Sequence, residues 1–563
     1  MTQNTVTQSS DKNAEWWRTE AIYEIFVRSF ADGNGDGIGD IPGIISRLPY
    51  ISKLGVDAIW LTPFYPSPQA DTGYDVSNYC DVDPMYGTLA DFDKMVETAH
   101  GLGLKVFIDI VPNHTSYQHP WFQAALKAAP NSAERNRYIF RDGKGANGEL
   151  PPNNWFSWFG ECAWTKVKGD KQWYLHMFSD QQPDLNWRNQ EVRDEFDRIL
   201  TFWLDRKVDG LRVDAPSVLI KPADFKDVVV EEGEGEDDMS PEDNLPELFP
   251  IYQHWRDLTN RYGARCIIGE VFPDSTESGL ENYIEKGKMS QIFCFDFQQT
   301  PWFAEEMREI IDEWLQLTEE YETTPIWVAN SHDLTRQPSR LGLDDLSAQL
   351  DGIRADDKQP DRALGERRAR AMAMLMTWLP GSICLYYGEE LGLPDDTNIK
   401  SDDVIDKMAE RDGCRMPMPW QANQPAFGFS STGKSWMKAP ALYAEYAVDK
   451  EEGDANSTLA LYRQLLKLRK ELGLTTGEVE YLKETENDLI VARNGTVCLA
   501  INFGEEDAAM PKGTILAKSL PTLTEGGTLP GGTAVWLKQD WALTAADILE
   551  EDDSEDEDED DDE

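Results

Sequence analysis

Four short segments of this chain combine an apolar run with polar side chains that could do acid–base or nucleophilic chemistry. They are, in chain order, 109–114 (DIVPNH), 210–214 (GLRVD), 269–272 (GEVF) and 332–333 (HD). Near-continuous apolar runs such as KVFIDIV and RCIIGE precede or enter them, as is typical of parallel strands buried on both faces. The carboxyl ends of the strands carry the active site in a (β/α)8 barrel. The pattern therefore predicts an α/β TIM-barrel enzyme with a centre of carboxylates.

Paired carboxylates suit the hydrolysis of a glycosidic bond, which passes through an oxocarbenium-like cation. One carboxylate attacks or stabilises C1, and a second, kept protonated, donates to the leaving oxygen. We assign Asp214 as nucleophile and Glu270 as acid/base, at the ends of successive predicted strands. A separation of about 5 to 5.5 Å between them would give retention of configuration. Arg212 lies on the same side of its strand as Asp214 and would hold the nucleophile ionised, with a merely local ion pair as the alternative.

The four segments resemble the signature regions of the α-amylase family, glycoside hydrolase family 13. The segment 182–186 (QPDLN) resembles a fifth region, found in the oligo-1,6-glucosidase and α-glucosidase branch, and the overall resemblance covers about residues 20–540. The resemblance implies Asp214 as nucleophile, Glu270 as proton donor and Asp333 as transition-state stabiliser. It makes His114 and His332 neutral hydrogen-bond partners of the sugar. Ser331 departs from the pattern, because the family usually has Asn directly before the His-Asp pair.

Two further segments resemble the family's loops for the terminal glucose. In 71–75 (DTGYD), Asp71 would hold that glucose and Tyr74 would stack beneath it, and in 411–415 (RDGCR) Arg415 would share its O4 hydroxyl with Asp71. Such a clamp closes the cleft beyond the first sugar and predicts exo action on short substrates. An ion pair remote from substrate is the alternative for Arg415. Phe178, with Trp164 and Trp173, is a candidate for the cleft wall, and core packing is its alternative.

The resemblance leaves linkage and reaction type open. The residue after the nucleophile tends to be Val in α-1,6-acting members, and it is Ala215 here, which favours α-1,4-linked maltose and short malto-oligosaccharides. A covalent glucosyl-enzyme can also pass its sugar to another hydroxyl, so a transglucosylase or isomerase, such as a trehalose synthase or a sucrose-acting enzyme, is the alternative. A non-catalytic transporter-associated scaffold is disfavoured, because the catalytic carboxylates are present and no membrane span is visible.

The glycine-rich segment 32–40 (DGNGDGIGD) has oxygen ligands at alternate positions, as in loops that wrap a hard cation. We predict a structural Ca²⁺ or Mg²⁺ site formed by the side chains of Asp32, Asn34, Asp36 and Asp40 and the carbonyl of Ile38. A similar loop occurs in the same branch of the family. Gly43 stands where an EF-hand has Glu, which excludes that motif, and a plain Gly-Asp turn is the alternative.

The predicted organisation has five parts. They are the first part of the catalytic barrel (1–113), an inserted subdomain B (114–186), the second part of the barrel (187–474), a C-terminal antiparallel β-domain (475–540) and an acidic disordered tail (541–563). Barrel strands are expected near residues 22–27, 58–61, 106, 211, 267, 292, 326 and 383. The acidic stretch 231–247 is expected to be a mobile loop at the cleft rim.

The composition of the chain restricts the classes of partner that we expect. The 563 residues carry a net charge of −50, which argues against nucleic acid or anionic membrane and leaves a neutral oligosaccharide or disaccharide as the expected partner. The seven cysteines are irregularly spaced and mostly lie in apolar runs, as expected of core thiols in a reducing compartment. No secretory signal or long apolar run is visible, so the expected location is cytoplasmic.

Overall fold

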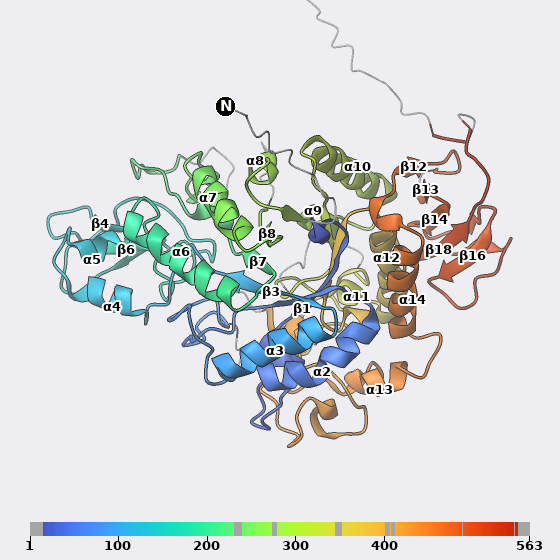
Figure 1. The fold of residues 1–563 in the computed structure, drawn as a ribbon, viewed down its shortest axis with the longest axis horizontal. Helices are drawn as coiled ribbons and strands as arrows, with labels where there is room; N and C mark the ends of the chain where they lie inside the picture. Colours follow the sequence, from blue (N-terminus) through green and yellow to red (C-terminus); the bar gives the residue numbers. More distant parts are fainter. Residues whose placement is uncertain are drawn as a thin grey trace, which may run out of the picture.

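A closed barrel of eight parallel strands lies at the centre of the computed structural model, which describes residues 15–229, 239–272, 279–343, 352–399, 406, 411–486, 488–544 and 547–549 (Figure 1). The strands follow the order β1-β11-β10-β9-β8-β7-β3-β2 around the barrel. Their bounds are β1 Ala21–Ile25, β2 Ala58–Leu61, β3 Lys105–Ile110, β7 Gly210–Val213, β8 Cys266–Gly269, β9 Gln291–Cys294, β10 Ile326–Val328 and β11 Ser382–Tyr386. The predicted TIM barrel is confirmed.

Helices surround the barrel, and the longer ones present an apolar stripe to it. In α6, for example, the buried residues Val192, Phe196, Ile199, Leu200, Trp203 and Leu204 recur at helical spacing. The helices of this layer are α1 Val27–Phe30, α2 Ile41–Leu54, α3 Leu89–Gly101, α6 Gln190–Asp205, α7 Phe249–Asn260, α8 Glu281–Ile284, α9 Phe295–Gln299, α10 Ala304–Glu320, α11 Gln337–Arg340, α12 Arg362–Trp378, α13 Val448–Glu451 and α14 Thr458–Glu471.

The barrel interior is mainly apolar, since alternate residues of successive strands pack against one another. This cluster contains Ile22, Ala58, Trp60, Phe107, Cys266, Ile268, Phe293, Ile326, Val328 and Cys384. Charged residues stand two positions further along three of these strands, on the same face: Glu24 on β1, Asp109 on β3 and Arg212 on β7. A layer of charged side chains therefore lies next to the apolar cluster, at the carboxyl end of the barrel.

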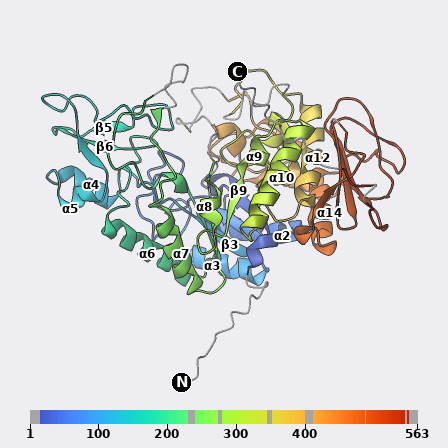
Figure 2. The ribbon, with the colours of Figure 1, turned by 90° about the horizontal axis from the view of Figure 1, so that it is seen from above.

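A small subdomain is inserted between β3 and α6. It contains α4 Pro120–Lys127, α5 Ala133–Asn136 and a three-stranded sheet of β4 Phe140–Asp142, β6 Gln172–Leu175 and β5 Trp164–Lys166. Trp155, Trp164 and Leu175 form its own buried cluster, with Trp173 and Phe178 packed against it. Figures 1 and 2 place this subdomain on the opposite side of the barrel from the C-terminal sheet.

The C-terminal domain consists of antiparallel β-structure that packs on α12 and α14. One sheet has the order β12-β13-β14-β18-β16, and β15 pairs with β17. The bounds are β12 Val479–Tyr481, β13 Leu489–Asn494, β14 Val497–Asn502, β15 Ala508–Ala509, β16 Thr514–Lys518, β17 Thr528–Leu529 and β18 Thr533–Lys538. The indole of Trp536 on β18 donates to the carbonyl of Met374 on α12 at 3.1 Å, which ties the domain to the barrel.

The two acidic segments are only partly described. Residues 230–238 of the acidic stretch and 550–563 of the tail lie outside the described residues. The tail was predicted to begin at 541, yet Ile548 forms a bridge with Leu482 and the amide of Leu549 donates to Tyr481 at 2.9 Å. These apolar residues interrupt the acidic composition, and they pair with an edge of the β-domain.

Candidate active site

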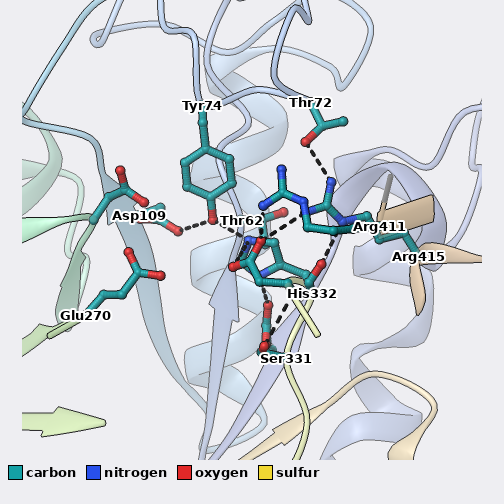
Figure 3. Close-up of polar contacts among 12 residues, drawn as sticks. Thr62, Thr72, Tyr74, Asp109, Glu270, Ser331, His332, Arg411 and Arg415 are labelled. Carbon is teal, nitrogen blue, oxygen red and sulfur yellow. Dashed lines mark hydrogen bonds and ion pairs between the residues drawn. The ribbon is translucent and has the colours of Figure 1, made fainter. Parts of the chain in front are cut away.

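The Arg212 guanidinium joins three carboxylates that come from three neighbouring barrel strands. Its Nη1 lies 2.9 Å from Asp109 Oδ1 and 2.8 Å from Asp214 Oδ1, and its Nη2 contacts Glu270 Oε1. All four side chains are buried, and β3, β7 and β8 are adjacent in the barrel. The side chains predicted from the strand ends, Asp214 and Glu270, therefore meet at one cation, with Asp109 beside Glu270 (Figure 3).

The backbone after β7 contributes to the same cluster. Ala215 has φ 40° and ψ 53°, in the left-handed region, and its amide donates to Glu270 Oε2 at 3.0 Å. This region is unfavourable for β-branched residues, so a small side chain suits the position. Ala215 thus links the segment that carries the nucleophile to the proposed acid.

Burial dominates the electrostatics of these carboxyls. It raises the pKa of Glu270 to about 8 and that of Asp214 to about 7, although Arg212 lowers both. We expected Arg212 to hold Asp214 ionised, and its contact does oppose the desolvation without overcoming it. Asp214 is the stronger acid of the two, so the pair can exist with Asp214 ionised and Glu270 protonated, the state that the predicted roles require.

Tyr74, His332 and Asp333 form a second group next to the first. The Tyr74 hydroxyl donates to Asp109 Oδ2 at 3.1 Å and lies 2.8 Å from His332 Nε2. The same Nε2 lies 3.1 Å from Asp333 Oδ2, and the rings of Tyr74 and His332 stack at 5.5 Å. Figure 3 shows Tyr74 reaching between Asp109 and His332, so this ring connects the carboxylate cluster to Asp333. Ser331 accepts the amide proton of Asp333 at 3.4 Å.

Two arginines of the 3-10 turn Arg411–Arg415 hold Asp333. Arg411 lies 2.5 Å from Asp333 Oδ1, and Arg415 lies 3.0 Å from the same oxygen. Together with Arg212 these guanidinium groups hold the pKa of Asp333 well below its usual range despite its burial, so this carboxylate is an anion.

Arg411, and not Arg415 as expected, is the arginine that contacts Asp71, at 3.2 Å. Arg415 instead donates to Thr72 Oγ1 at 3.2 Å and to the carbonyl of His332 at 2.7 Å. Asp406 pairs with both arginines, at 2.8 Å from Arg411 and 3.3 Å from Arg415.

His114 and Phe178 lie on the side of the candidate active site that faces the inserted subdomain. Gln182, from the segment that resembles the fifth signature region, donates to Asp71 Oδ2 at 2.9 Å and contacts His114 Nε2 at 3.1 Å. Burial lowers the pKa of His114 to about 3, which keeps this imidazole neutral. The Phe178 ring packs edge-on against it at 4.9 Å. Trp164 is a core residue of the subdomain, and Trp173 packs against that core.

The glycine-rich loop uses its side chains as internal acceptors. Asp32 accepts the amide protons of Gly35 and Gly37, at 2.6 and 2.8 Å, and Asn34 and Asp36 each accept from the residue two positions on. Asp40 is the N-cap of α2 and accepts from Gly43 at 2.6 Å. In the part of the chain that the structure describes, no three His, Cys, Asp or Glu side chains are grouped so that they could hold a metal ion. Ile38 donates its amide to Asp36, and the cation site predicted for this loop stays a prediction.

Sequence reasoning missed Asp109, Arg411, Gln182 and Glu24 as parts of the site. Asp109 is the first residue of a segment that we singled out, and Arg411 stands four residues before the arginine that we chose. The signal for both is that they are charged residues within segments that already carry a candidate site residue. Glu24 carried no local signal beyond being a charged residue within an apolar strand.

Comparison with known proteins agrees with this geometry. Residues 24–477 match the family described as alpha amylase, catalytic domain. The chain belongs to this family. It is a glycoside hydrolase of the α-glucosidase branch, as predicted. A probable alpha-glucosidase of Rhizobium meliloti (strain 1021) is 36% identical over 521 residues, which cover 87% of this chain and 89% of the relative.

Solved structures extend the similarity to the whole architecture. An alpha-glucosyl transfer enzyme, XgtA, is 35% identical with a TM-score of 0.79, covering 93% of this chain and 100% of the other. An isomaltulose synthase variant from Erwinia rhapontici NX5, in complex with sucrose, is 29% identical with a TM-score of 0.80 over 93% and 99% of the two chains. The family and fold are thus shown, whereas these names differ in the reaction that they describe.

The remaining predictions concern thiols and membranes. All seven cysteines are free thiols in the structure. No helix among the described residues combines the length and apolar character needed to cross a membrane.

Proposed function

We propose that this protein is an exo-acting, retaining α-glucosidase that releases terminal glucose from maltose and short malto-oligosaccharides. One observation carries the proposal: Arg212 contacts both Asp214 and Glu270, which lie buried at the ends of adjacent barrel strands, where burial raises the pKa of each. Ionised Asp214 attacks C1, and protonated Glu270 donates to the leaving oxygen. Water activated by the resulting Glu270 carboxylate then hydrolyses the glucosyl-enzyme.

Exo action is supported by the charged group beyond Asp333. Arg411 contacts both Asp71 and Asp406 there, and Gln182 donates to the second oxygen of Asp71. Such charged groups recognise the hydroxyls of a terminal sugar by charge-assisted hydrogen bonds and leave no apolar path for a longer chain. Cytoplasmic location remains part of the proposal and rests on the sequence alone.

Transglucosylation is the second candidate, and Phe272 favours it. This side chain lies two residues after Glu270, is 48% exposed and stacks on Phe295 at 4.5 Å. Both rings line a cavity of about 40 Å³ that Glu270, Arg212 and Asp333 also line. The exposed ring of Phe272, supported by the buried ring of Phe295, suits stacking on an acceptor sugar and the exclusion of water. The relatives named for glucosyl transfer and isomaltulose synthesis belong to the same fold.

The reaction products distinguish hydrolysis from transglucosylation. Incubation with maltose, isomaltose and sucrose, followed by chromatographic separation of free glucose from new disaccharides, should show mainly glucose from maltose. New disaccharides as the main product would establish the transferase. Phe272→Ala should lower the ratio of transfer to hydrolysis, with Phe303→Ala as the control, since Phe303 is an exposed phenylalanine outside the site.

A structural Ca²⁺ or Mg²⁺ in the loop 32–40 also remains a proposal. Its support is the alternate spacing of oxygen side chains along the loop. No step of the proposed mechanism uses this cation.

A further inference from the structure

Glu24 is a buried carboxyl that the proposed mechanism does not use. It is fully buried on β1, beside an apolar barrel interior, and its Oε1 lies 2.5 Å from Nδ1 of His332. A carboxyl in such a place is costly unless it is paired or neutral. Its contact with the histidine next to Asp333 therefore needs an explanation in terms of protons.

The other ring nitrogen of His332 identifies where the proton is. Nε2 lies 3.1 Å from Asp333 Oδ2, an anion that can only accept, and 2.8 Å from the Tyr74 hydroxyl. That hydroxyl has one proton, and it donates it to Asp109. Both neighbours of Nε2 are thus acceptors, so Nε2 carries a hydrogen.

Nδ1 must then be the acceptor, because the ring is neutral. Burial, together with Arg415, Arg212 and Arg411, holds the pKa of His332 well below its usual range. A neutral imidazole has one N–H only, and here it is on Nε2. The hydrogen between Nδ1 and Oε1 consequently belongs to Glu24.

The second oxygen of Glu24 supports a neutral acid independently. Oε2 is buried and, within the described residues, has no hydrogen-bond partner. An unpartnered carbonyl oxygen of a protonated acid costs far less than an unpartnered oxygen of a carboxylate. The charged groups that face Glu24 are Asp333 and Asp109, which disfavour its ionisation, and Arg212, which favours it; burial prevails and raises the pKa of Glu24 well above its ordinary value.

We propose that Glu24 is a positioning residue, which donates its carboxylic-acid proton to Nδ1 of His332 and thereby fixes that imidazole as the Nε2–H tautomer. Nε2–H then points at Asp333 and at the sugar hydroxyls that the proposed function places there. Ionisation of Glu24 would move the hydrogen to Nδ1 and set a lone pair of Nε2 against the Asp333 carboxylate. The consequence for activity rests on the proposed function, whereas the tautomer does not.

Nuclear magnetic resonance of ¹⁵N-histidine-labelled protein tests the tautomer without substrate. The His332 signals are assigned by their loss in His332→Gln. Wild-type protein at neutral pH should show an unprotonated Nδ1 and a protonated Nε2, and the pattern should reverse as the pH rises through the pKa of Glu24. Glu24→Gln should show the neutral-pH pattern at every pH, because its amide donates to Nδ1 and cannot ionise. A protonated Nδ1 in the wild type at neutral pH would overturn the proposal.

Kinetics supply the second test. Glu24→Leu removes the donor and should lower kcat/KM by roughly 10- to 100-fold, a range typical for partners that orient an active-site histidine. Glu24→Gln should restore most of that loss. Glutamine can donate to Nδ1 through its amide nitrogen or accept from Nδ1–H through its oxygen, so its activity shows only that a polar partner is needed, and a variant as poor as Glu24→Leu would contradict the proposal.

A matched control separates this role from mere burial. Glu390 is also fully buried, and it accepts from the hydroxyls of Tyr23 and Tyr50, at 2.8 and 2.7 Å, away from the site. Glu390→Gln should change the melting temperature without altering the His332 tautomer. If Glu24→Leu does not fold, the tautomer of the wild type at neutral pH, which needs no substitution at Glu24, still decides between a neutral and an anionic Glu24.

Discussion

At the scale of single residues, one arginine and burial together set the chemistry. Arg212 contacts Asp109, Asp214 and Glu270, so one positive charge serves three carboxyls that are all removed from water. One cation cannot keep three buried carboxyls ionised, and the pKa of each is raised. Burial beside one shared cation therefore raises the pKa of both the proposed acid and the proposed nucleophile, by similar amounts.

Removing the charge of the nucleophile should abolish turnover. Asp214→Asn keeps the shape of the side chain but lacks the carboxylate that attacks C1, so kcat on an aryl α-glucoside should fall by roughly 10³-fold or more. Circular dichroism should show unchanged folding, since the amide can still accept from Arg212. Turnover above a tenth of the wild-type value would remove Asp214 from the mechanism.

The pH profile should report both carboxyls. Activity requires ionised Asp214 and protonated Glu270, so kcat/KM should rise as the pH passes about 7 and fall as it passes about 8. Glu270→Gln should lose far more activity on maltose than on a substrate with a good leaving group, which needs no proton. For the wild-type enzyme acting on the substrate with a good leaving group, the fall of kcat/KM at alkaline pH should disappear. If that fall is unchanged, it reports the ionisation of a group other than Glu270.

At the scale of elements, loops after the strands bring the site together, and segments outside the barrel complete it. Tyr74 follows β2, Gln182 belongs to the inserted subdomain, and Arg411 follows β11. The glycine-rich loop follows α1 and ends at Asp40, which caps α2. This loop is held by its own turns, and the predicted cation would add to them.

Metal analysis and melting curves test that loop. If a cation binds, chelation should lower the melting temperature, since a ligand of the folded state alone stabilises it by mass action, by about 2.7 kcal/mol at a hundred times Kd. Asp36→Ala should then abolish the response to added Ca²⁺ or Mg²⁺. Asp36→Asn is the control, because its oxygen can still accept from Ile38 while its charge is gone. Absence of metal from the purified protein, with no shift on adding it, would leave a loop held only by its hydrogen bonds.

At the scale of the whole molecule, the net charge of −50 is the dominant property. Charges of one sign repel one another in the compact state, and salt screens this repulsion with a Debye length of about 10 Å at 0.1 M. Much of the excess is spread over the chain, and part is concentrated in the segment 550–563.

Moderate salt should therefore raise the melting temperature of the full chain. Deletion of residues 550–563 should leave kcat/KM unchanged and should weaken the dependence of stability on salt, because it removes acidic groups without removing apolar residues that could pack. Differential scanning fluorimetry across a salt series checks the first expectation. A fall in activity, or a change of oligomeric state at fixed salt, would show that the segment is a docking element.

The sequence by itself determined the barrel, the family and the candidate catalytic carboxylates. Parallel strands buried on both faces leave a local pattern, an apolar run that turns polar at its end, and Asp214 and Glu270 stand at such ends. Local composition also indicated the β-domain, because alternation is a property of neighbouring residues. Each of these features can be recognised from a short stretch of neighbouring residues.

Only the tertiary structure decided which side chains share protons and charges. It paired Asp71 with Arg411, 340 residues away, and Glu24 with His332, 308 residues away. It also placed Asp40 at the N-cap of α2. Burial in the folded chain raised the pKa of Asp214, although the nearby positive charge of Arg212 lowers it. The reason is physical: desolvation and hydrogen-bond geometry depend on every element packed around a group, and no local pattern in the chain records those neighbours.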